Sequence, residues 1–425
     1  MPQLLVSDIK LLVNVREKSY LLKGRELANL PCIENAYLLI DNGIIGGFGK
    51  MDSLPQSIKS IPVSSRIDAS RSMILPAWCD SHTHIVFSGS RETEFVDKIR
   101  GMTYAEINAR GGGILESARK VNAASEDELF INAWNRVGEV ARMGTGAIEI
   151  KSGYGLSVEG ELKMLRVIKK LKQKSKLRIK STFLGAHSYP AEFRENHQEY
   201  IDSILNHMIP VISRDGLADF IDVFCDKGFF NPEEMSVICR AAMDHGMKPK
   251  LHVNQLHSVG GIEAGLSLPA LSLDHLESIT ESEIDLLAGR THLNGYPPWE
   301  GACTLLPTAA FFLRMNHPPA RKLIDAGAGI AIASDYNPGS SPSGNMNLVV
   351  AMSCIQMRML PEESINAATL NGAWAMDCSE ELGSITLGKK ANLIFTRSIP
   401  SLAYIPYSFG TDCIDRVMIG GEWVR

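Results

Sequence analysis

Apolar and polar residues follow one pattern in the middle of the chain and another at its two ends. In the middle, eight short apolar runs alternate with segments whose apolar residues recur at helical spacing. The runs predict buried strands at residues 74–84, 147–151, 179–187, 220–225, 250–254, 270–275, 302–306 and 329–335. The segments between them predict helices, among them residues 126–143, 158–174, 232–245 and 281–288. The first of these helices follows Ser125, which is a favourable N-cap residue.

Eight strand–helix units in about 300 residues predict an α/β fold of the (β/α)8 barrel type. An open, doubly wound sheet is the structural alternative. That fold is disfavoured because no Gly-x-Gly-x-x-Gly motif opens a helix in this sequence.

Both ends of the chain have a β-rich pattern. Residues 9–13 predict a strand, and residues 36–48 predict a hairpin that turns at Asn42-Gly43. Near the C-terminus, residues 391–395 predict a strand and residues 416–424 a second hairpin. We therefore expect residues 1–76 and 382–425 to form a small β-sandwich-like domain, and residues 77–381 to form the barrel.

The composition excludes several functional classes. The chain has 425 residues, 45% hydrophobic and 21% charged, with a net charge of -5 and no basic stripe, which argues against nucleic-acid binding. No apolar run reaches the ~18 residues of a membrane span, and no signal peptide is visible. The eight cysteines form no Cys-x-x-Cys pair, and Cys79, Cys225 and Cys303 lie in or beside apolar runs. We expect a cytoplasmic protein that acts on a small molecule.

Histidines gather where the predicted strands end, which is where a barrel carries its active site. His82 and His84 end the first strand, and His187 ends the third. His252 lies in the fifth strand and His275 ends the sixth, while Asp335 ends the eighth. Any one of these histidines alone is more often an ordinary core or loop residue. Together they predict a catalytic centre.

The same residues supply a plausible metal site. Zinc and similar ions take three or four nitrogen or oxygen ligands and keep an open position when catalytic. His82, His84, His252 and Asp335 provide such a set. His275 is then available as a base or an oxyanion partner next to the ligands. Asp335 can carry a proton as well as bind the metal.

Five motifs carry a resemblance to a known family. They are residues 80–84, 149–155, 182–187, 272–277 and 334–340, the last reading Ser-Asp-Tyr-Asn-Pro-Gly-Ser. With these motifs the chain resembles the metal-dependent amidohydrolase superfamily over nearly its whole length. The resemblance implies one zinc or iron ion on the four ligands named above, and a homodimer.

The resemblance also implies a substrate and a reaction. The reaction is hydrolysis of the ring amide of 4-imidazolone-5-propanoate to N-formimidoyl-L-glutamate. Water attacks the ring carbonyl, Asp335 moves the proton, and the metal or protonated His275 stabilises the oxyanion. The implied substrate contacts are Arg91, Tyr154, His187, Asn337, Gly339 and Ser340, with Tyr104 close by. Arg91 fits this role because a guanidinium binds a carboxylate with two parallel hydrogen bonds.

The sequence departs from the family pattern at the fifth strand. The family's His-x-x-Glu motif here ends in Gln255, whose amide can orient substrate but cannot carry a proton. Lys227 lies beyond the fourth strand, where binuclear relatives place a carboxylated lysine within it, so we expect one metal ion. Two other functions stay open. One is a deaminase of a heterocyclic amine, against which Gln255 argues, and the other is a metal-free scaffold, against which the intact ligand set argues.

Overall fold

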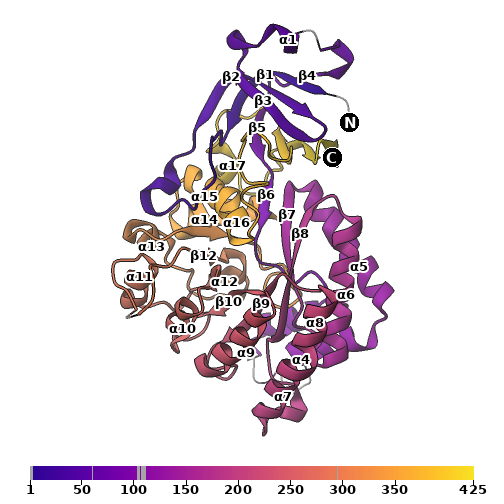
Figure 1. Ribbon diagram of the computed structural model, residues 1–425, viewed down its shortest axis with the longest axis vertical. Helices are drawn as coiled ribbons and strands as arrows, with labels where there is room; N and C mark the ends of the chain where they lie inside the picture. The colour runs from indigo at the N-terminus through magenta and orange to yellow at the C-terminus, as the bar shows by residue number, and fades with distance from the viewer. Residues whose placement is uncertain (1–2, 60, 103–105, 107–111, 294) are drawn as a thin grey trace.

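The computed structural model describes residues 3–59, 61–102, 106, 112–293 and 295–425. Two eight-stranded sheets organise these residues. One is a small sheet assembled from both ends of the chain, and the other is a parallel sheet of the middle residues. Figure 1 shows the small sheet at the top, with both termini beside it, and the second sheet below, wrapped by helices.

The small sheet has the strand order β16-β15-β14-β5-β1-β2-β3, with β4 paired to β1. Its strands are β1 (Leu4–Val13), β2 (Cys32–Asp41), β3 (Ile44–Lys50), β4 (Arg66–Asp68), β5 (Met73–Pro76), β14 (Leu393–Thr396), β15 (Ile414–Ile419) and β16 (Glu422–Trp423). Asn42 and Gly43 both have positive φ, as the tight turn between β2 and β3 requires. The predicted hairpins are therefore present. The division into domains at residues 76 and 382 stays a prediction.

The parallel sheet confirms the predicted barrel. Its strands are β6 (Trp78–Asp80), β7 (Thr145–Lys151), β8 (Arg178–Ala186), β9 (Phe220–Cys225), β10 (Lys248–Val253), β11 (Ser272–His275), β12 (Ala302–Leu305) and β13 (Ile330–Ile332). Each strand pairs in parallel with the next, from β6 to β13. Nearly every residue of these strands is buried, as expected for a sheet covered by helices.

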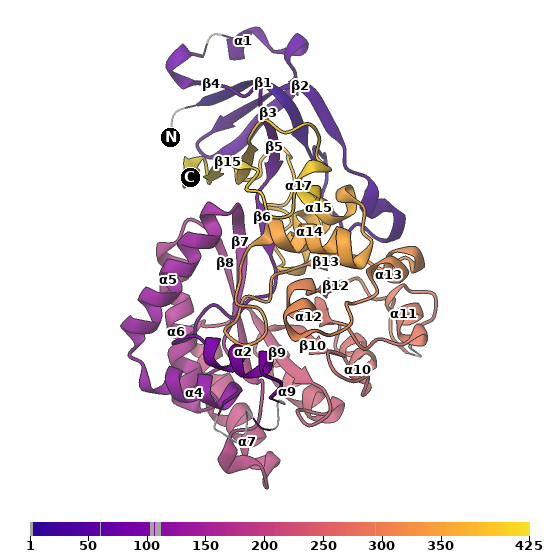
Figure 2. The same cartoon turned by 180° about the vertical axis from the view of Figure 1, so that it is seen from behind.

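Helices follow the strands along the chain. The longer ones are α2 (Glu92–Ile99), α4 (Ile114–Ala123), α5 (Glu126–Arg142), α6 (Val158–Lys174), α9 (Pro232–Asp244), α14 (Met346–Met357) and α15 (Pro361–Ala368). The shorter ones are α1 (Gln56–Lys59), α7 (His197–Ser203), α8 (Ile209–Asp215), α10 (Gly261–Ser267), α11 (Glu281–Leu287), α12 (Pro307–Leu313), α13 (Ala320–Ala326), α16 (Leu370–Ala375) and α17 (Tyr404–Tyr407). The four predicted helices correspond to α5, α6, α9 and α11. Ser125 caps α5 by accepting a hydrogen bond from Glu128 N. Figure 2, the view from behind, shows α2 in front of the barrel.

One predicted strand is wrong in its extent. We expected a single strand over residues 74–84, whereas β5 ends at Pro76 and belongs to the small sheet, and β6 begins at Trp78 in the barrel. The chain changes sheets at Ala77, whose N–H donates to Asn392 O across 2.9 Å. His82 and His84 therefore follow the first barrel strand instead of lying within it. None of the described helices is long and apolar enough to span a membrane.

Candidate active site

The predicted metal-binding residues lie at the seam where the barrel closes. Thr83 forms a parallel bridge with Tyr336, which joins the segment after β6 to the segment after β13. Around this bridge, Asp335 N donates to His82 O across 3.0 Å, and His84 N donates to Tyr336 O across 2.9 Å. These bonds bring together residues that are more than 250 positions apart in the sequence. The backbone at Asp335 has a φ of 51°, a left-handed conformation that costs free energy in a residue other than glycine.

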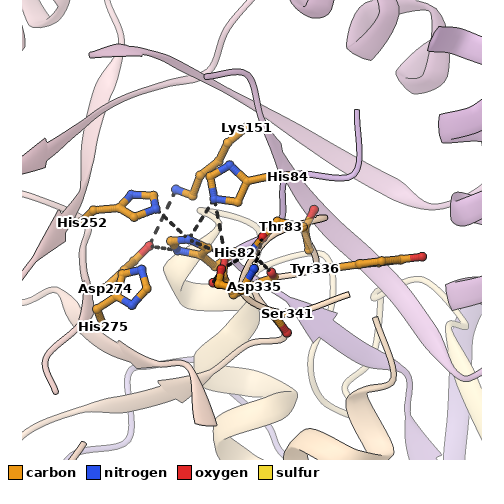
Figure 3. A network of polar contacts seen from close by, with 12 residues as sticks. His82, Thr83, His84, Lys151, His252, Asp274, His275, Asp335, Tyr336 and Ser341 are labelled. Carbon is orange, nitrogen blue, oxygen red and sulfur yellow. Dashed lines mark hydrogen bonds and ion pairs between the residues drawn. The ribbon is translucent and has the colours of Figure 1, made fainter. Parts of the chain in front are cut away.

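Four side chains converge on one point at this seam (Figure 3). The Nε2 atom of His82 lies 3.1 Å from that of His252 and 3.4 Å from that of His84. Asp335 Oδ1 is 3.6 Å from His82 Nε2 and 3.5 Å from His84 Nε2. Ligands placed tetrahedrally around zinc at their usual bond lengths lie about 3.3–3.4 Å apart. The spacing of these four groups therefore fits a metal ion.

The hydrogen bonds of the histidines also fit a cation. His82 Nδ1 is 2.6 Å from Asp274 Oδ2, and His252 Nδ1 is 2.7 Å from Asp222 Oδ2. Since a carboxylate accepts, both rings donate from Nδ1, and their Nε2 atoms carry lone pairs that face each other. Burial lowers the pKa of His82, His84 and His252, which keeps the rings neutral. Converging lone pairs on neutral imidazoles repel one another unless a cation lies between them.

Two titratable groups next to the histidines have shifted proton affinities. Burial raises the pKa of Asp335 to about 7. Burial alone would lower the pKa of His275, but the Glu277 carboxylate, 3.4 Å from His275 Nδ1, outweighs it and raises that pKa. His275 and Leu276 both have positive φ, 84° and 68°, so the strand ends in a strained turn at this histidine. The arrangement favours a protonated His275 beside a carboxyl that can exchange a proton.

A cavity of 460 Å³ adjoins the histidines. All the predicted substrate contacts that the structure describes line it: Arg91, Tyr154, His187, Gln255, Asn337, Gly339 and Ser340. Its apolar walls include Phe224, Phe229, Leu313 and Met315. Tyr104, the remaining predicted contact, lies outside the described residues. The cavity meets the metal-binding residues where the His187 ring stacks on His84, with centroids 5.4 Å apart.

Arg91 enters the cavity as a fixed cation. Its Nε and Nη2 donate to Glu94 Oε2 across 3.0 and 2.6 Å, while Glu94 Oε1 accepts from Gly113 N. The remaining nitrogen, Nη1, lies so close to Gly339 that a Cβ atom there would be 2.2 Å away. Gly339 therefore has to be glycine for the guanidinium to occupy this position.

A buried carboxylate holds the loop that carries Tyr154. Glu161 is fully buried and accepts from the backbone N–H groups of Gly153, Gly155 and Leu156 across 2.9, 2.7 and 3.0 Å. The Gly153 carbonyl in turn accepts from His187 Nδ1 across 2.9 Å, which leaves His187 Nε2 as an acceptor. Burial lowers the pKa of His187 to about 3, so this ring is neutral.

The loop after β13 is held by Asn337. Its Oδ1 accepts from Gly339 N and Ser340 N, both across 2.8 Å, and its Nδ2 donates to Asp335 O and Ser340 Oγ, both across 2.7 Å. Ser340 Oγ reaches Asp335 Oδ2 across 3.3 Å. The side chain of Asn337 is therefore committed to shaping the loop, while Ser340 and the backbone face the cavity.

Charged residues that were not predicted as part of the site lie beneath the histidines. They are Glu149, Asp222, Lys250 and Asp274, which together with Lys151 are fully buried in the barrel. For two of them a signal was available, because Glu149 alternates with Lys151 in β7, and Lys250 alternates with His252 in β10. Alternate positions of a barrel strand share one face, so these charges point the same way.

Comparison with known proteins places this site in a family. The model of the amidohydrolase family matches residues 73–424. The imidazolonepropionase of Flavobacterium johnsoniae is 52% identical over 98% of this chain and 99% of its own length. That of Christiangramia forsetii is 49% identical over 99% of this chain and 100% of its own length.

Among solved structures, guanine deaminase of E. coli matches with a TM-score of 0.74 at 15% identity, covering 100% of this chain and 99% of that one. This similarity shows the fold alone. The two imidazolonepropionases match over 98% and 99% of this chain at 52% and 49% identity. This chain belongs to the amidohydrolase family and, within it, to the imidazolonepropionases.

Proposed function

We propose that this protein hydrolyses the ring amide of 4-imidazolone-5-propanoate to N-formimidoyl-L-glutamate, a step in histidine degradation. The observation that carries the proposal is 52% identity to an imidazolonepropionase over 98% of the chain. The cavity supports it because Arg91 supplies a cation at its wall and a set of neutral histidines lies at its base.

His82, His84, His252 and Asp335 would hold one zinc or iron ion. The distances between their ligand atoms support this assignment, as do the lone pairs that converge from His82 and His252. When bound, such an ion supplies Lewis-acid chemistry, lowering the pKa of water towards neutrality and polarising a carbonyl oxygen.

The cavity residues would bind the substrate and fix its orientation. The Arg91 guanidinium, already held by Glu94, would bind the propionate carboxylate as a charge-assisted pair. Tyr154 and neutral His187 lie against the metal-binding histidines and would hold the flat ring. Gln255, Ser340 and the backbone of Gly339 would complete the polar contacts.

Asp335 would carry the proton of the reaction. Its carboxylate takes a proton from the attacking water and passes it to the ring nitrogen that leaves, which balances the hydrolysis. His275, kept protonated by Glu277, would donate to the oxyanion that forms on the ring carbonyl. Gln255 has no group that titrates near neutrality, so it takes no part in proton transfer.

Product analysis separates this reaction from deamination. The protein is incubated with 4-imidazolone-5-propanoate and, separately, with purines and pyrimidines that carry an exocyclic amine. We expect N-formimidoyl-L-glutamate from the first and no ammonia from the others. Ammonia release from a base, without ring opening of the imidazolone, would contradict the proposal and favour a deaminase.

The metal, the assembly and the cellular location have their own tests. We propose a homodimer in the cytoplasm that carries one zinc or iron ion per chain. Elemental analysis of protein purified without added metal identifies the ion. Sedimentation equilibrium gives the mass in solution, and a value equal to a single chain would contradict the dimer.

A further inference from the structure

A cluster of buried charges beneath the histidines has no part in the proposed reaction. It contains three carboxylates, Glu149, Asp222 and Asp274, and two ammonium groups, Lys151 and Lys250, all with 0% exposed surface. They come from four strands of the barrel, β7, β9, β10 and β11. Burying five charges is costly unless each has partners, so the contacts within the cluster indicate what it does.

Lys151 is the centre of the cluster. Its Nζ donates to Glu149 Oε1 and to Asp222 Oδ2, both across 2.8 Å, and lies 3.7 Å from Asp274 Oδ2. Burial alone would lower the pKa of Lys151, but the three carboxylates outweigh it and raise that pKa above its ordinary value. Lys151 is therefore a cation that donates a hydrogen bond to Asp222 and forms an ion pair with Asp274.

Those two aspartates set the orientation of two proposed metal ligands. The Oδ2 atom of Asp222 that meets Lys151 also accepts from His252 Nδ1, and its Oδ1 accepts from His252 N across 3.0 Å. The Oδ2 atom of Asp274 nearest to Lys151 accepts from His82 Nδ1. Figure 3 shows Lys151 and Asp274 beside His82, His84 and His252.

We infer that Lys151 is a positioning residue of the metal centre: its ammonium holds Asp222 and Asp274 in place, and through them fixes the ring orientation and tautomer of His252 and His82. The inference rests on the metal site of the proposed function. Without Lys151, two carboxylates would face each other in a dry interior, and like charges there repel strongly. The carboxylates would turn apart, and the histidines would lose the acceptors that aim Nε2 at the metal position.

Lys250 provides a matched control because it is a second buried lysine in the same cluster. Its Nζ lies 3.5 Å from Glu149 Oε2 and 3.9 Å from Asp274 Oδ2, and it has no hydrogen-bond partner within the described part of the chain. Lys250→Met removes the same charge as Lys151→Met but breaks no hydrogen bond to an aspartate that orients a histidine.

The test is zinc affinity, measured by competition with a chromophoric chelator on metal-free wild type, Lys151→Met and Lys250→Met. Loss of a group that orients a metal ligand typically lowers affinity about 10- to 100-fold. We expect a loss of that size for Lys151→Met and a clearly smaller one for Lys250→Met. Unchanged affinity in Lys151→Met, or equal losses in both variants, would overturn the inference.

Nitrogen NMR of labelled histidine gives a second readout that a general loss of stability would not produce. In metal-free wild type and Lys250→Met, His82 and His252 should be Nδ1–H tautomers. In Lys151→Met, mixed tautomers are expected, and a pattern identical to wild type would overturn the inference. If Lys151→Met fails to fold, the comparison uses Lys151→Gln and Lys250→Gln, which keep a polar donor in the interior. The larger loss of zinc affinity is again expected at Lys151.

Neither readout needs substrate, so the two proposals can fail separately. A wild type that binds zinc and shows these variant effects without opening the imidazolone ring refutes only the proposed function. A wild type that opens the ring while Lys151→Met binds zinc as tightly as wild type refutes only the role of Lys151.

Discussion

Replacement of Arg91 by alanine tests how the protein recognises its substrate. Arg91 Nε and Nη2 each donate a hydrogen bond to Glu94. The third nitrogen, Nη1, packs on Gly339 and faces the cavity. Losing a charge-assisted hydrogen bond costs about 1.5–3 kcal/mol, or roughly 10- to 150-fold in rate. We therefore expect Arg91→Ala to lower kcat/KM for 4-imidazolone-5-propanoate by that factor.

The assay compares two substrates and two variants. The second substrate is the same imidazolone ring without its carboxylate, and the second variant is Lys98→Ala, which removes the other cation that lines the cavity. Arg91→Ala should act on the ring without a carboxylate as wild type does, and Lys98→Ala should resemble wild type on both. Equal losses on the two substrates for Arg91→Ala would refute the reasoning, because Arg91 would then only support its loop.

Changes at four further residues, Asp335, Gln255, Glu161 and Lys389, have expected outcomes. Asp335→Asn should nearly abolish turnover, since general acid–base groups contribute about 100- to 10,000-fold and a metal ligand is weakened as well. Gln255→Ala should cost only about 0.5–1.5 kcal/mol, and Gln255→Glu should stay active with a shifted profile of kcat against pH. Glu161→Gln, which turns an amide donor towards Gly153 N, should raise KM about tenfold with kcat and metal content kept. The equivalent change at buried Glu363, whose carboxylate accepts from the N–H of the N-cap residue Leu360 at the start of α15, should leave both constants unchanged. Burial lowers the pKa of Lys389 to about 8 in the folded protein. Below that pH the buried ammonium destabilises the fold, and above about pH 10.5 the side chain is a neutral amine in both the folded and the unfolded protein. The melting temperature of wild type should therefore rise relative to that of Lys389→Met between pH 8 and 10.5, and parallel curves would show that Lys389 is not the cause.

The sequence predicts the barrel well because its strands are buried on both faces and appear as continuous apolar runs. The helices α5, α6, α9 and α11 were predictable from helical spacing and, for α5, from the Ser125 cap. The first strand was predicted wrongly. The apolar run from Met73 to Trp78 continues through Pro76, and periodicity alone cannot tell that the chain leaves one sheet and enters another there.

The sequence predicts which polar side chains meet at the barrel seam, but not the contacts that hold them there. His82, His84, His252 and Asp335 could be named because metal-ligating side chains at strand ends are conspicuous in a sequence. Their actual meeting point depends on the bridge between Thr83 and Tyr336, which is a contact over long sequence separation that local patterns do not encode. Local patterns also do not predict the contacts of Lys151 with Asp222 and Asp274, since a buried salt bridge depends on which strands lie close together in the barrel.

The central claim is that hydrolysis depends on one metal ion held at the barrel seam. The most direct test is a titration in which chelated, metal-free protein receives zinc or iron in steps while the loss of 4-imidazolone-5-propanoate is followed by absorbance. We predict no turnover without metal and a rate that saturates at one ion per chain, with both occupancy and rate reduced in His252→Ala. Full activity in metal-free protein would contradict the claim.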